Sequence, residues 1–277
     1  DFIAIKLTDF TMNIHHLRSA TFIIETGNNF ILIDPMLGKK GSLPAFSYVK
    51  FKAEKNPLVE LPDNAAELLG KVTHCFITHS QTFNIRAFQH TDHLDRTGEK
   101  FLADKQIPVY TFSHDAPYLK NLGLNVQAGI EHWKEIQFLG GRLVAIPAKH
   151  GHGWISKFMA NGCGFFLDLP NEPSIYISGD TVLTEDVKTA IFQFNPDITV
   201  VAAGEAQMDV GKPILMTESE VRKFIQLSPK HVIANHFEAL NHCPVKRADI
   251  QNLVAEIGEK DRVYIPDDGQ TLSFHLN

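Results

Sequence analysis

Short apolar runs bounded by turn-forming residues recur along the whole chain. In the first part they lie at 3–7, 20–25 and 30–33, and the last two are separated by T-G-N-N, which is typical of a hairpin turn. Later runs of the same kind lie at 72–77, 109–112, 143–146, 165–169, 175–177, 198–201 and 231–234. Apolar runs of this length predict buried strands.

Three segments have the helical spacing of apolar residues instead. The first two have apolar faces formed by Val187, Ala190, Ile191 and Phe194 and by Ile250, Leu253, Val254 and Ile257. The third begins with T-E-S-E at 217–220, a capping box, and ends before Pro229. Because these helices alternate with strands, the chain is predicted to be mixed α/β.

Length and composition favour one continuous unit. The chain has 277 residues, of which 44% are hydrophobic and 21% charged, as in ordinary globular proteins. Layered α/β folds reach about 250 residues as one domain, and the sequence contains no internal repeat and no linker rich in Pro, Ser or Gly. We therefore expect a single domain over 1–277.

The net charge and the cysteine positions indicate which kinds of partner are excluded and which compartment is expected. A net charge of -6 provides no basic surface for nucleic acid. No apolar run is long enough to predict a transmembrane segment. Cys75, Cys163 and Cys243 show no C-x-x-C spacing, which argues against disulfides and favours a reducing compartment. A cytoplasmic location rests on this cysteine usage alone, because a cleaved signal peptide would leave no trace.

Histidines and aspartates cluster directly after the predicted strand at 72–77. T-H-S follows at 78–80, and after nine further residues comes H-T-D-H-L-D at 90–95. This places His79, His90, Asp92 and His93 near one strand end. Neutral imidazole and carboxylate suit a borderline divalent ion, and three or four such ligands leave a coordination position open for catalysis.

Three more candidate ligands follow later strands. P-A-K-H ends at His150, with His152 as the competing candidate; S-G-D-T contains Asp180; and A-N-H-F contains His236. Taken alone, S-G-D-T is more typical of a turn than of a ligand. Its position after a strand, in order with the other candidates, favours a ligand.

With residues 81–89 set aside, the first cluster reads T-H-S-H-T-D-H, which resembles the T-H-x-H-x-D-H signature of the metallo-β-lactamase superfamily. The resemblance spans most of the chain and implies an αβ/βα four-layer sandwich of the metallo-β-lactamase type. It also implies a binuclear site, in which His79, His90 and His150 hold the first metal, Asp92, His93 and His236 hold the second, and Asp180 lies between them.

This resemblance implies a hydrolase in which two divalent ions activate a water molecule, oriented by Asp92 and Asp180 as the catalytic residues. Zinc is the first expectation, and manganese or iron also fit histidine and carboxylate ligands. The residues I-D-P at 33–35 resemble a segment that runs under the metal site, where Asp34 is expected to support a ligand rather than to be one.

The spacing between His79 and His90 departs from the family, which keeps these histidines two residues apart. Closing a longer loop costs only about 0.6 kcal/mol per doubling of length, so we expect both ligands to be retained. Failure of His79 to reach its ion is the alternative. Phe83, Ile85 and Phe88 on this loop are candidates to border the substrate pocket.

The substrate is a small molecule, and its class depends on the branch of the superfamily. P-A-x-H and the sequence N-H-F-E-A-L-N-H-C at 235–243 resemble the ascorbate-6-phosphate lactonase-like branch. We therefore expect hydrolysis of an ester-type bond, with a lactone favoured. A phosphodiesterase or phospholipase D-like hydrolase is the alternative, and a non-catalytic metal-binding scaffold is a third possibility. The sequence predicts no oligomeric state.

Five polar residues near the ligand strands are candidates either to contact substrate or to brace the ligands: Glu205, Gln207, Glu238, Asn241 and His242.

Overall fold

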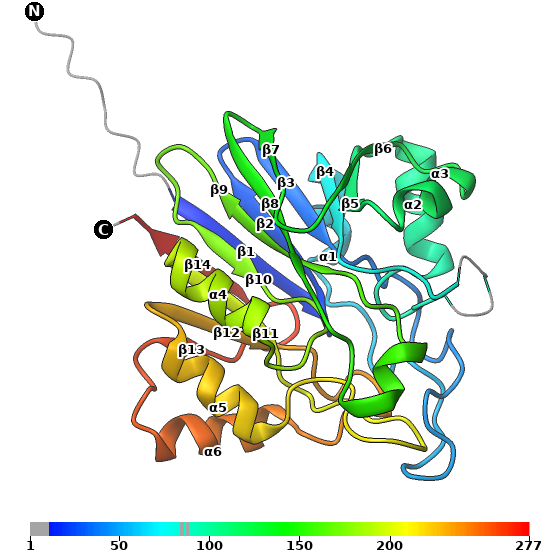
Figure 1. Ribbon diagram of the computed structural model, residues 1–277. Coiled ribbons are helices and arrows are strands. Elements are labelled where there is room, and N and C mark those ends of the chain that lie inside the picture. The colour runs from blue at the N-terminus through cyan, green and yellow to red at the C-terminus, as the bar shows by residue number, and fades with distance from the viewer. Residues whose placement is uncertain (1–10, 84–85, 87–88, 277) are drawn as a thin grey trace, which may run out of the picture.

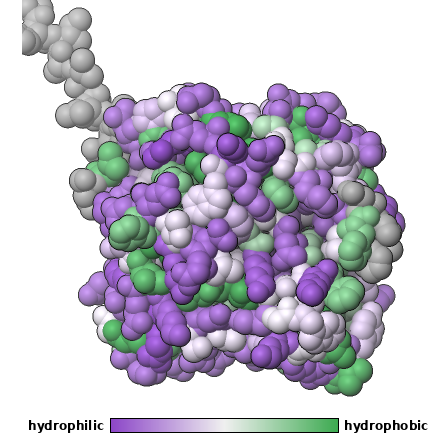
Figure 2. All heavy atoms as spheres, viewed as in Figure 1, coloured by the Kyte–Doolittle hydropathy of each residue, from purple (hydrophilic) through white to green (hydrophobic). Residues whose placement is uncertain are grey.

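Two stacked β-sheets with helices on their outer faces form the computed structural model, which describes residues 11–83, 86 and 89–276 (Figure 1). The predicted strand at 3–7 lies outside the described residues. The four layers confirm the predicted mixed α/β sandwich. On the face shown in Figure 2, hydrophilic residues predominate and hydrophobic ones are scattered among them.

The first sheet has seven strands in the order β14-β1-β2-β3-β4-β5-β6. Strands β14 to β3 pair antiparallel, and β3 to β6 pair parallel. The predicted hairpin is formed by β2 and β3. The strands, in chain order, are β1 (Thr11–Arg18), β2 (Thr21–Thr26), β3 (Asn29–Ile33), β4 (His74–Ile77), β5 (Val109–Phe112), β6 (Val126–Ile130) and β14 (Thr271–His275).

The second sheet also has seven strands, in the order β13-β12-β11-β10-β9-β8-β7. Strands β13 to β10 pair parallel, and β10 to β7 pair antiparallel. In chain order they are β7 (Glu135–Phe138), β8 (Gly141–Pro147), β9 (Cys163–Asp168), β10 (Ile175–Ile177), β11 (Ile198–Ala202), β12 (His231–Asn235) and β13 (Val263–Tyr264).

The helices cover the two outer faces. On the first sheet lie α1 (Ala65–Lys71), α2 (Arg96–Lys105) and α3 (Ala116–Asn121), packed on residues such as Leu32 and Ile77. On the second lie α4 (Glu185–Phe194), α5 (Glu218–Leu227) and α6 (Arg247–Glu256). These last three are the helices predicted from periodicity, and the capping box at Thr217 and Glu220 is present. No described helix is long and apolar enough to cross a bilayer.

The main core lies between the sheets, where apolar side chains from both inner faces interdigitate. Phe76 of β4 and Phe165 of β9 meet with ring centroids 5.2 Å apart, and both are fully buried. Burying one such side chain contributes about 1.5 to 3 kcal/mol. This packing fixes the two sheets against each other, so that loops following strands of both sheets reach one common edge.

Candidate metal centre

The candidate ligands converge where strands of both sheets reach their carboxyl ends. His79 follows β4 in the first sheet, and His150, Asp180 and His236 follow β8, β10 and β12 in the second. Strands β4, β10 and β12 belong to the parallel parts of the sheets, whose carboxyl ends reach one edge, which is where sites are built in such folds. Strand β8 runs in the same direction as β10, because both pair antiparallel with β9.

Histidines 79, 90 and 150 form one group, whose ligand atoms all lie within 4.8 Å of one another. The ring centroids of His79 and His90 are 4.8 Å apart, so the intervening residues do not separate them. The backbone amide of His90 donates to the carbonyl of Ser80 at 2.8 Å, and Gln81 and Gln89 form a β-bridge. The two ends of the inserted segment therefore lie side by side, as expected.

The remaining four candidates form the second group: Asp92, His93, Asp180 and His236. Oδ2 of Asp180 lies 3.1 Å from Nε2 of His93 and 3.4 Å from Nε2 of His236. It also lies 3.7 Å from Nε2 of His150 in the first group. Asp180 thus stands between the two groups, in the position expected of a bridging carboxylate.

Hydrogen bonds on the far side of the rings orient three of the histidines. Nδ1 of His93 lies 2.9 Å from Oδ2 of Asp34, and Nδ1 of His150 lies 2.9 Å from the carbonyl oxygen of Ile214. Nδ1 of His236 lies 3.7 Å from Sγ of Cys243. Such contacts fix the tautomer that leaves Nε2 free for a metal.

The carboxylate of Asp34 contacts two residues at the centre, Thr78 and His93. It accepts hydrogen bonds from the backbone amide and the hydroxyl of Thr78, both at 2.8 Å, besides contacting His93. The backbone of Asp34 is left-handed, with φ 45°, an uncommon conformation for a residue other than glycine. The geometry agrees with the expected supporting role of Asp34.

Gly162 packs directly against Thr78 and His79, where there is no space for a side chain. A Cβ at this position would clash with the Thr78 carbonyl oxygen and lie 2.5 Å from Cβ of His79. Glycine is therefore required for the close approach of the two backbones.

Several buried polar atoms at the centre have no hydrogen-bond partner among the described residues. They are Nε2 of His79, His93 and His236 and Oδ1 of Asp180; the contacts of Asp180 Oδ2 with His93 and His236 are close but lack hydrogen-bond geometry. Buried polar groups are normally paired, and five imidazoles and two carboxylates are a donor set suited to divalent ions. The residues present therefore fit a binuclear metal centre.

Burial and mutual charge set the protonation of the first group. Burial lowers the pKa of His79 well below its ordinary value, that of His90 to about 3, and that of His150 as well. These three imidazoles are neutral at pH 7, and a neutral imidazole has a lone pair that can bind a cation. Nε2 of His90 accepts a long hydrogen bond, 3.4 Å, from the backbone amide of Ala160.

The second group pairs carboxylates with imidazoles. Burial lowers the pKa of His93, but Asp180, Asp34 and Asp92 outweigh burial and raise it well above its ordinary value. Burial alone would raise the pKa of Asp180, but His236 and His93 hold it well below its ordinary value. The carboxylates of this group are therefore ionised, and a cation that replaced the protons would be held by negative charge.

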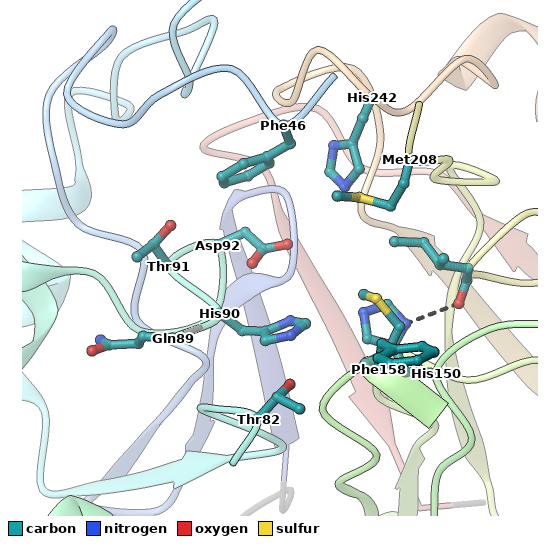
Figure 3. Close-up of a pocket in the computed structure, with 12 residues that line it drawn as sticks. Phe46, Thr82, Gln89, His90, Thr91, Asp92, His150, Phe158, Met208 and His242 are labelled. Carbon is teal, nitrogen blue, oxygen red and sulfur yellow. Dashed lines mark hydrogen bonds between the residues drawn. The ribbon is translucent and has the colours of Figure 1, made fainter. Parts of the chain in front are cut away.

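A cavity of about 220 Å³ opens onto the centre. In Figure 3, His90 and Asp92 face this space, with Phe46, Met208 and His242 at the end away from Thr82. The lining residues are Phe46, Thr82, Gln89, His90, Thr91, Asp92, His150, Phe158, Met159, Met208, Ile214 and His242. Apart from the candidate ligands and His242, the lining is apolar or uncharged.

His152, the competing candidate for the third histidine, belongs to neither ligand group. Its Nδ1 lies 2.7 Å from the carbonyl oxygen of Pro213, and its Nε2 lies 2.9 Å from Oε2 of Glu220. Both ring nitrogens are thus occupied by partners outside the centre, and the geometry favours His150.

Of the five polar candidates near the ligand strands, four bond parts of the protein other than the candidate ligands, and one lines the cavity. The carboxylate of Glu205 accepts from the amide of Glu218 and the side chain of Gln207. Glu238 pairs with Arg247 at 3.5 Å. Asn241 bonds the backbone of Phe46 and Ser47, and only His242 lines the cavity.

The expectation that Phe83 borders the pocket is wrong for the described residues. Its side chain is 56% exposed on a left-handed turn with φ 64°, and Thr82 and Gln89 line the cavity instead. Ile85 and Phe88 lie outside the described residues.

The apolar residues that line the cavity are not predicted by any pattern in the sequence. Phe46, Phe158 and Met208 come from segments without a periodic pattern, and no local signal marks them. Their positions depend on contacts distant in sequence, such as the bond from the amide of Phe46 to Asn241, so only the folded chain reveals them.

The fold is similar to several solved structures. A possible metal-dependent hydrolase of Veillonella parvula is 25% identical, with TM-score 0.82, covering 95% of this chain and 99% of that one. An isothiocyanate hydrolase from Delia radicum gut bacteria is 27% identical, with TM-score 0.83, covering 96% and 100%. The metallo-beta-lactamase fold protein YhfI of Bacillus subtilis, 11% identical with TM-score 0.58 over 96% and 100%, supports the fold alone.

Relatives in sequence give the family, although no protein-family model matches the chain. UPF0173 protein YddR of Bacillus subtilis is 31% identical over 268 residues, which are 95% of this chain and 100% of that protein. A UPF0173 metal-dependent hydrolase of Cupriavidus metallidurans is 24% identical over 276 residues, covering 93% and 83%. The comparisons do not confirm the ascorbate-6-phosphate lactonase-like branch. The family name supports an enzyme over a non-catalytic scaffold, and the chain belongs to the UPF0173 family of metal-dependent hydrolases.

Proposed function

We propose that this hydrolase acts on a small, uncharged substrate at an electrophilic carbon. The observation that carries the proposal is the cavity of about 220 Å³ beside the candidate metal centre, whose apolar lining residues are Phe46, Phe158, Met159, Met208 and Ile214. A cavity of this size suits a small molecule, and its apolar wall favours a largely apolar one.

Charge argues against the alternative of a phosphodiester. Among the described residues that line the cavity, none is lysine or arginine, the side chains that recognise phosphate best. Asp92 lies in the lining and is ionised, because His93 and His90 outweigh burial and lower its pKa. An anionic substrate would rely on the metal ions alone to balance its charge.

The seven clustered residues would hold the ions: His79, His90 and His150 the first, Asp92, His93 and His236 the second, with Asp180 between them. Two divalent ions, zinc by first expectation, would lower the pKa of a bound water to about 7 and supply hydroxide at neutral pH. Asp92 and Asp180 act as acceptors that orient the attacking water. Asp34 and Cys243 keep their histidines in place.

Two substrate types meet the requirements of the cavity. A lactone, the first expectation from the sequence, presents a neutral carbonyl carbon of the right size. An isothiocyanate presents a neutral, apolar carbon electrophile, and it is favoured by the similarity to the isothiocyanate hydrolase over the full length of both chains. In both cases water adds to carbon and a carbon–heteroatom bond breaks.

The test is a hydrolysis panel with zinc- or manganese-loaded protein. γ-Butyrolactone and benzyl isothiocyanate represent the neutral substrates, and bis(4-nitrophenyl) phosphate represents the phosphodiesters. We expect at least one neutral substrate to be hydrolysed with a kcat/KM about 100-fold or more above the phosphodiester, and EDTA to abolish turnover. A preference for the phosphodiester would contradict the proposal.

A further inference from the structure

His242 is a buried histidine in the cavity wall that neither ligand group uses. It lies in the loop after β12, six residues beyond His236, and its side chain is only 3% exposed. In Figure 3 it lies beside Met208 and Phe46, and its ring meets that of Phe46 edge to face at 5.1 Å. Its position lets it contact a molecule held against the metal centre.

The ring of His242 has no hydrogen-bond partner in the described part of the chain. Nδ1 is buried without a hydrogen bond, and no hydrogen bond within the described part of the chain involves the other ring nitrogen. By contrast, His150 and His152 each bond a backbone carbonyl, at 2.9 and 2.7 Å. A buried polar ring left without a partner costs stability, which calls for a role such as binding a ligand.

The loop that carries His242 is held in place on both sides. The backbone amide of Gln207 donates to the carbonyl of His242 at 2.9 Å, and the adjacent Asn241 is bonded to Phe46, Ser47 and Asn56. The imidazole is therefore presented from a fixed backbone, as a group that recognises a substrate requires.

Burial lowers the pKa of His242 to about 4, so its imidazole is neutral at pH 7. A neutral imidazole has one N–H donor and one acceptor nitrogen. It can thus stabilise developing negative charge on a heteroatom by donating a hydrogen bond from its N–H, without the second proton of an imidazolium that would be transferred.

We propose that His242 is a catalytic residue that donates a hydrogen bond to the substrate heteroatom leaving the attacked carbon. The inference rests on the proposed function. For a lactone, water oxygen bonds to the carbonyl carbon, the ring C–O bond breaks, and the leaving oxygen receives a proton of that water. For an isothiocyanate, water adds to carbon, the C–N bond breaks, and nitrogen receives both water protons, giving an amine and carbonyl sulfide.

The test compares His242→Phe and His242→Gln with the wild type on whichever panel substrate is hydrolysed. Phe keeps a planar ring without a donor, and it should lower kcat about 100-fold or more, with a smaller change in KM. Gln supplies an amide donor and should recover part of that loss. Metal content of both variants should match the wild type, and the unfolding temperature of His242→Phe should equal or exceed it, because Phe removes an unpaired buried polar ring. His275→Gln, which changes an exposed histidine of β14, is the control.

A readout independent of turnover is the ¹⁵N spectrum of the histidine rings in the metal-loaded protein. We expect γ-butyrolactone at saturation to shift the resonances that are absent from His242→Gln. If the wild type hydrolyses neither neutral substrate, the proposed function is refuted. The shift of the His242 resonances then tests separately whether His242 contacts a bound ligand. Wild-type kinetics in His242→Phe, loss of metal in step with activity, or an unshifted resonance would overturn the inference.

Discussion

Replacing Asp34 by asparagine tests whether contacts behind the candidate ligands control metal binding. In the wild type, Oδ1 accepts from the amide of Thr78, while Oδ2 accepts from its hydroxyl and contacts Nδ1 of His93. Asparagine keeps the size and the acceptor at Oδ1, but it places a donor at Oδ2. Nδ1 of His93 must then accept, which moves the proton to Nε2, the nitrogen that faces the centre.

The expected effect follows from the loss of this orienting contact. Removing such a partner typically weakens metal binding about 10- to 100-fold, which corresponds to about 1.4 to 2.7 kcal/mol. The loss should fall on the second group, which contains His93, while the group of His79, His90 and His150 keeps its affinity. Asp34→Asn should therefore bind one ion normally and the other more weakly.

Competition titration with a chromophoric chelator measures both affinities, and thermal unfolding of the metal-free protein measures stability separately. Asp115→Asn is the matched control, since Asp115 is equally buried and accepts from the amide and hydroxyl of Ser80, both at 2.7 Å, but contacts no candidate ligand ring. It should lose stability without losing metal affinity. Wild-type binding of both ions by Asp34→Asn, or an equal loss in Asp115→Asn, would refute the reasoning.

Asp180→Ala should abolish hydrolysis and lower metal content measured by plasma mass spectrometry, whereas His152→Ala should retain most of both. If His152→Ala had the larger effect, His152 and not His150 would be the third histidine of the first group. Gly162→Ala should displace His79 and lower kcat about 100-fold, because errors near 1 Å have that effect; unchanged kinetics would show that the backbone yields. Burial lowers the pKa of His16, so below pH 6.5 the unfolded chain binds a proton that the folded chain does not, and stability falls with acidification. In chemical denaturation of metal-free protein, His16→Gln should reduce the slope of unfolding free energy against pH by up to about 1.4 kcal/mol per unit, and parallel curves would contradict this.

Four of the candidate ligands could be predicted because each follows an apolar strand directly, and His90, Asp92 and His93 because they repeat the H-x-D-H pattern after the inserted segment. His79, His150, Asp180 and His236 come one to three residues after strands whose ends share one edge. Sequence order and position after a strand thus carry information about position in space. Their three-dimensional clustering, within 4.8 Å in each group, is the outcome of that rule.

Strand β1 could not be predicted, because three of its buried positions are polar and interrupt the apolar pattern of Met12, Ile14 and Leu17. His15, His16 and Arg18 are nearly inaccessible, and each depends on partners far along the chain. Arg18 donates to three backbone carbonyl oxygens, and His16 pairs with Asp268 at 3.3 Å. Polar residues are buried when such partners exist, and periodicity in one segment cannot reveal them.

The cavity wall was equally beyond prediction. Its shape depends on the segment around Phe46, which is held by Asn241 and by Asp209. The carboxylate of Asp209 accepts from the backbone amides of Tyr48, Val49 and Lys50. Contacts of this kind join residues about 160 positions apart, so they follow from the fold and not from local sequence.

The bridge between Gln81 and Gln89 makes the segment between them a natural place for engineering and divergence. Because the chain departs and returns at this bridge, segments of other lengths and compositions can be grafted there while the histidines on either side keep their positions. Thr82 and Gln89 line the cavity, so each graft would alter its entrance. A library of variants of this segment would vary the substrate range while the candidate ligands stay unchanged.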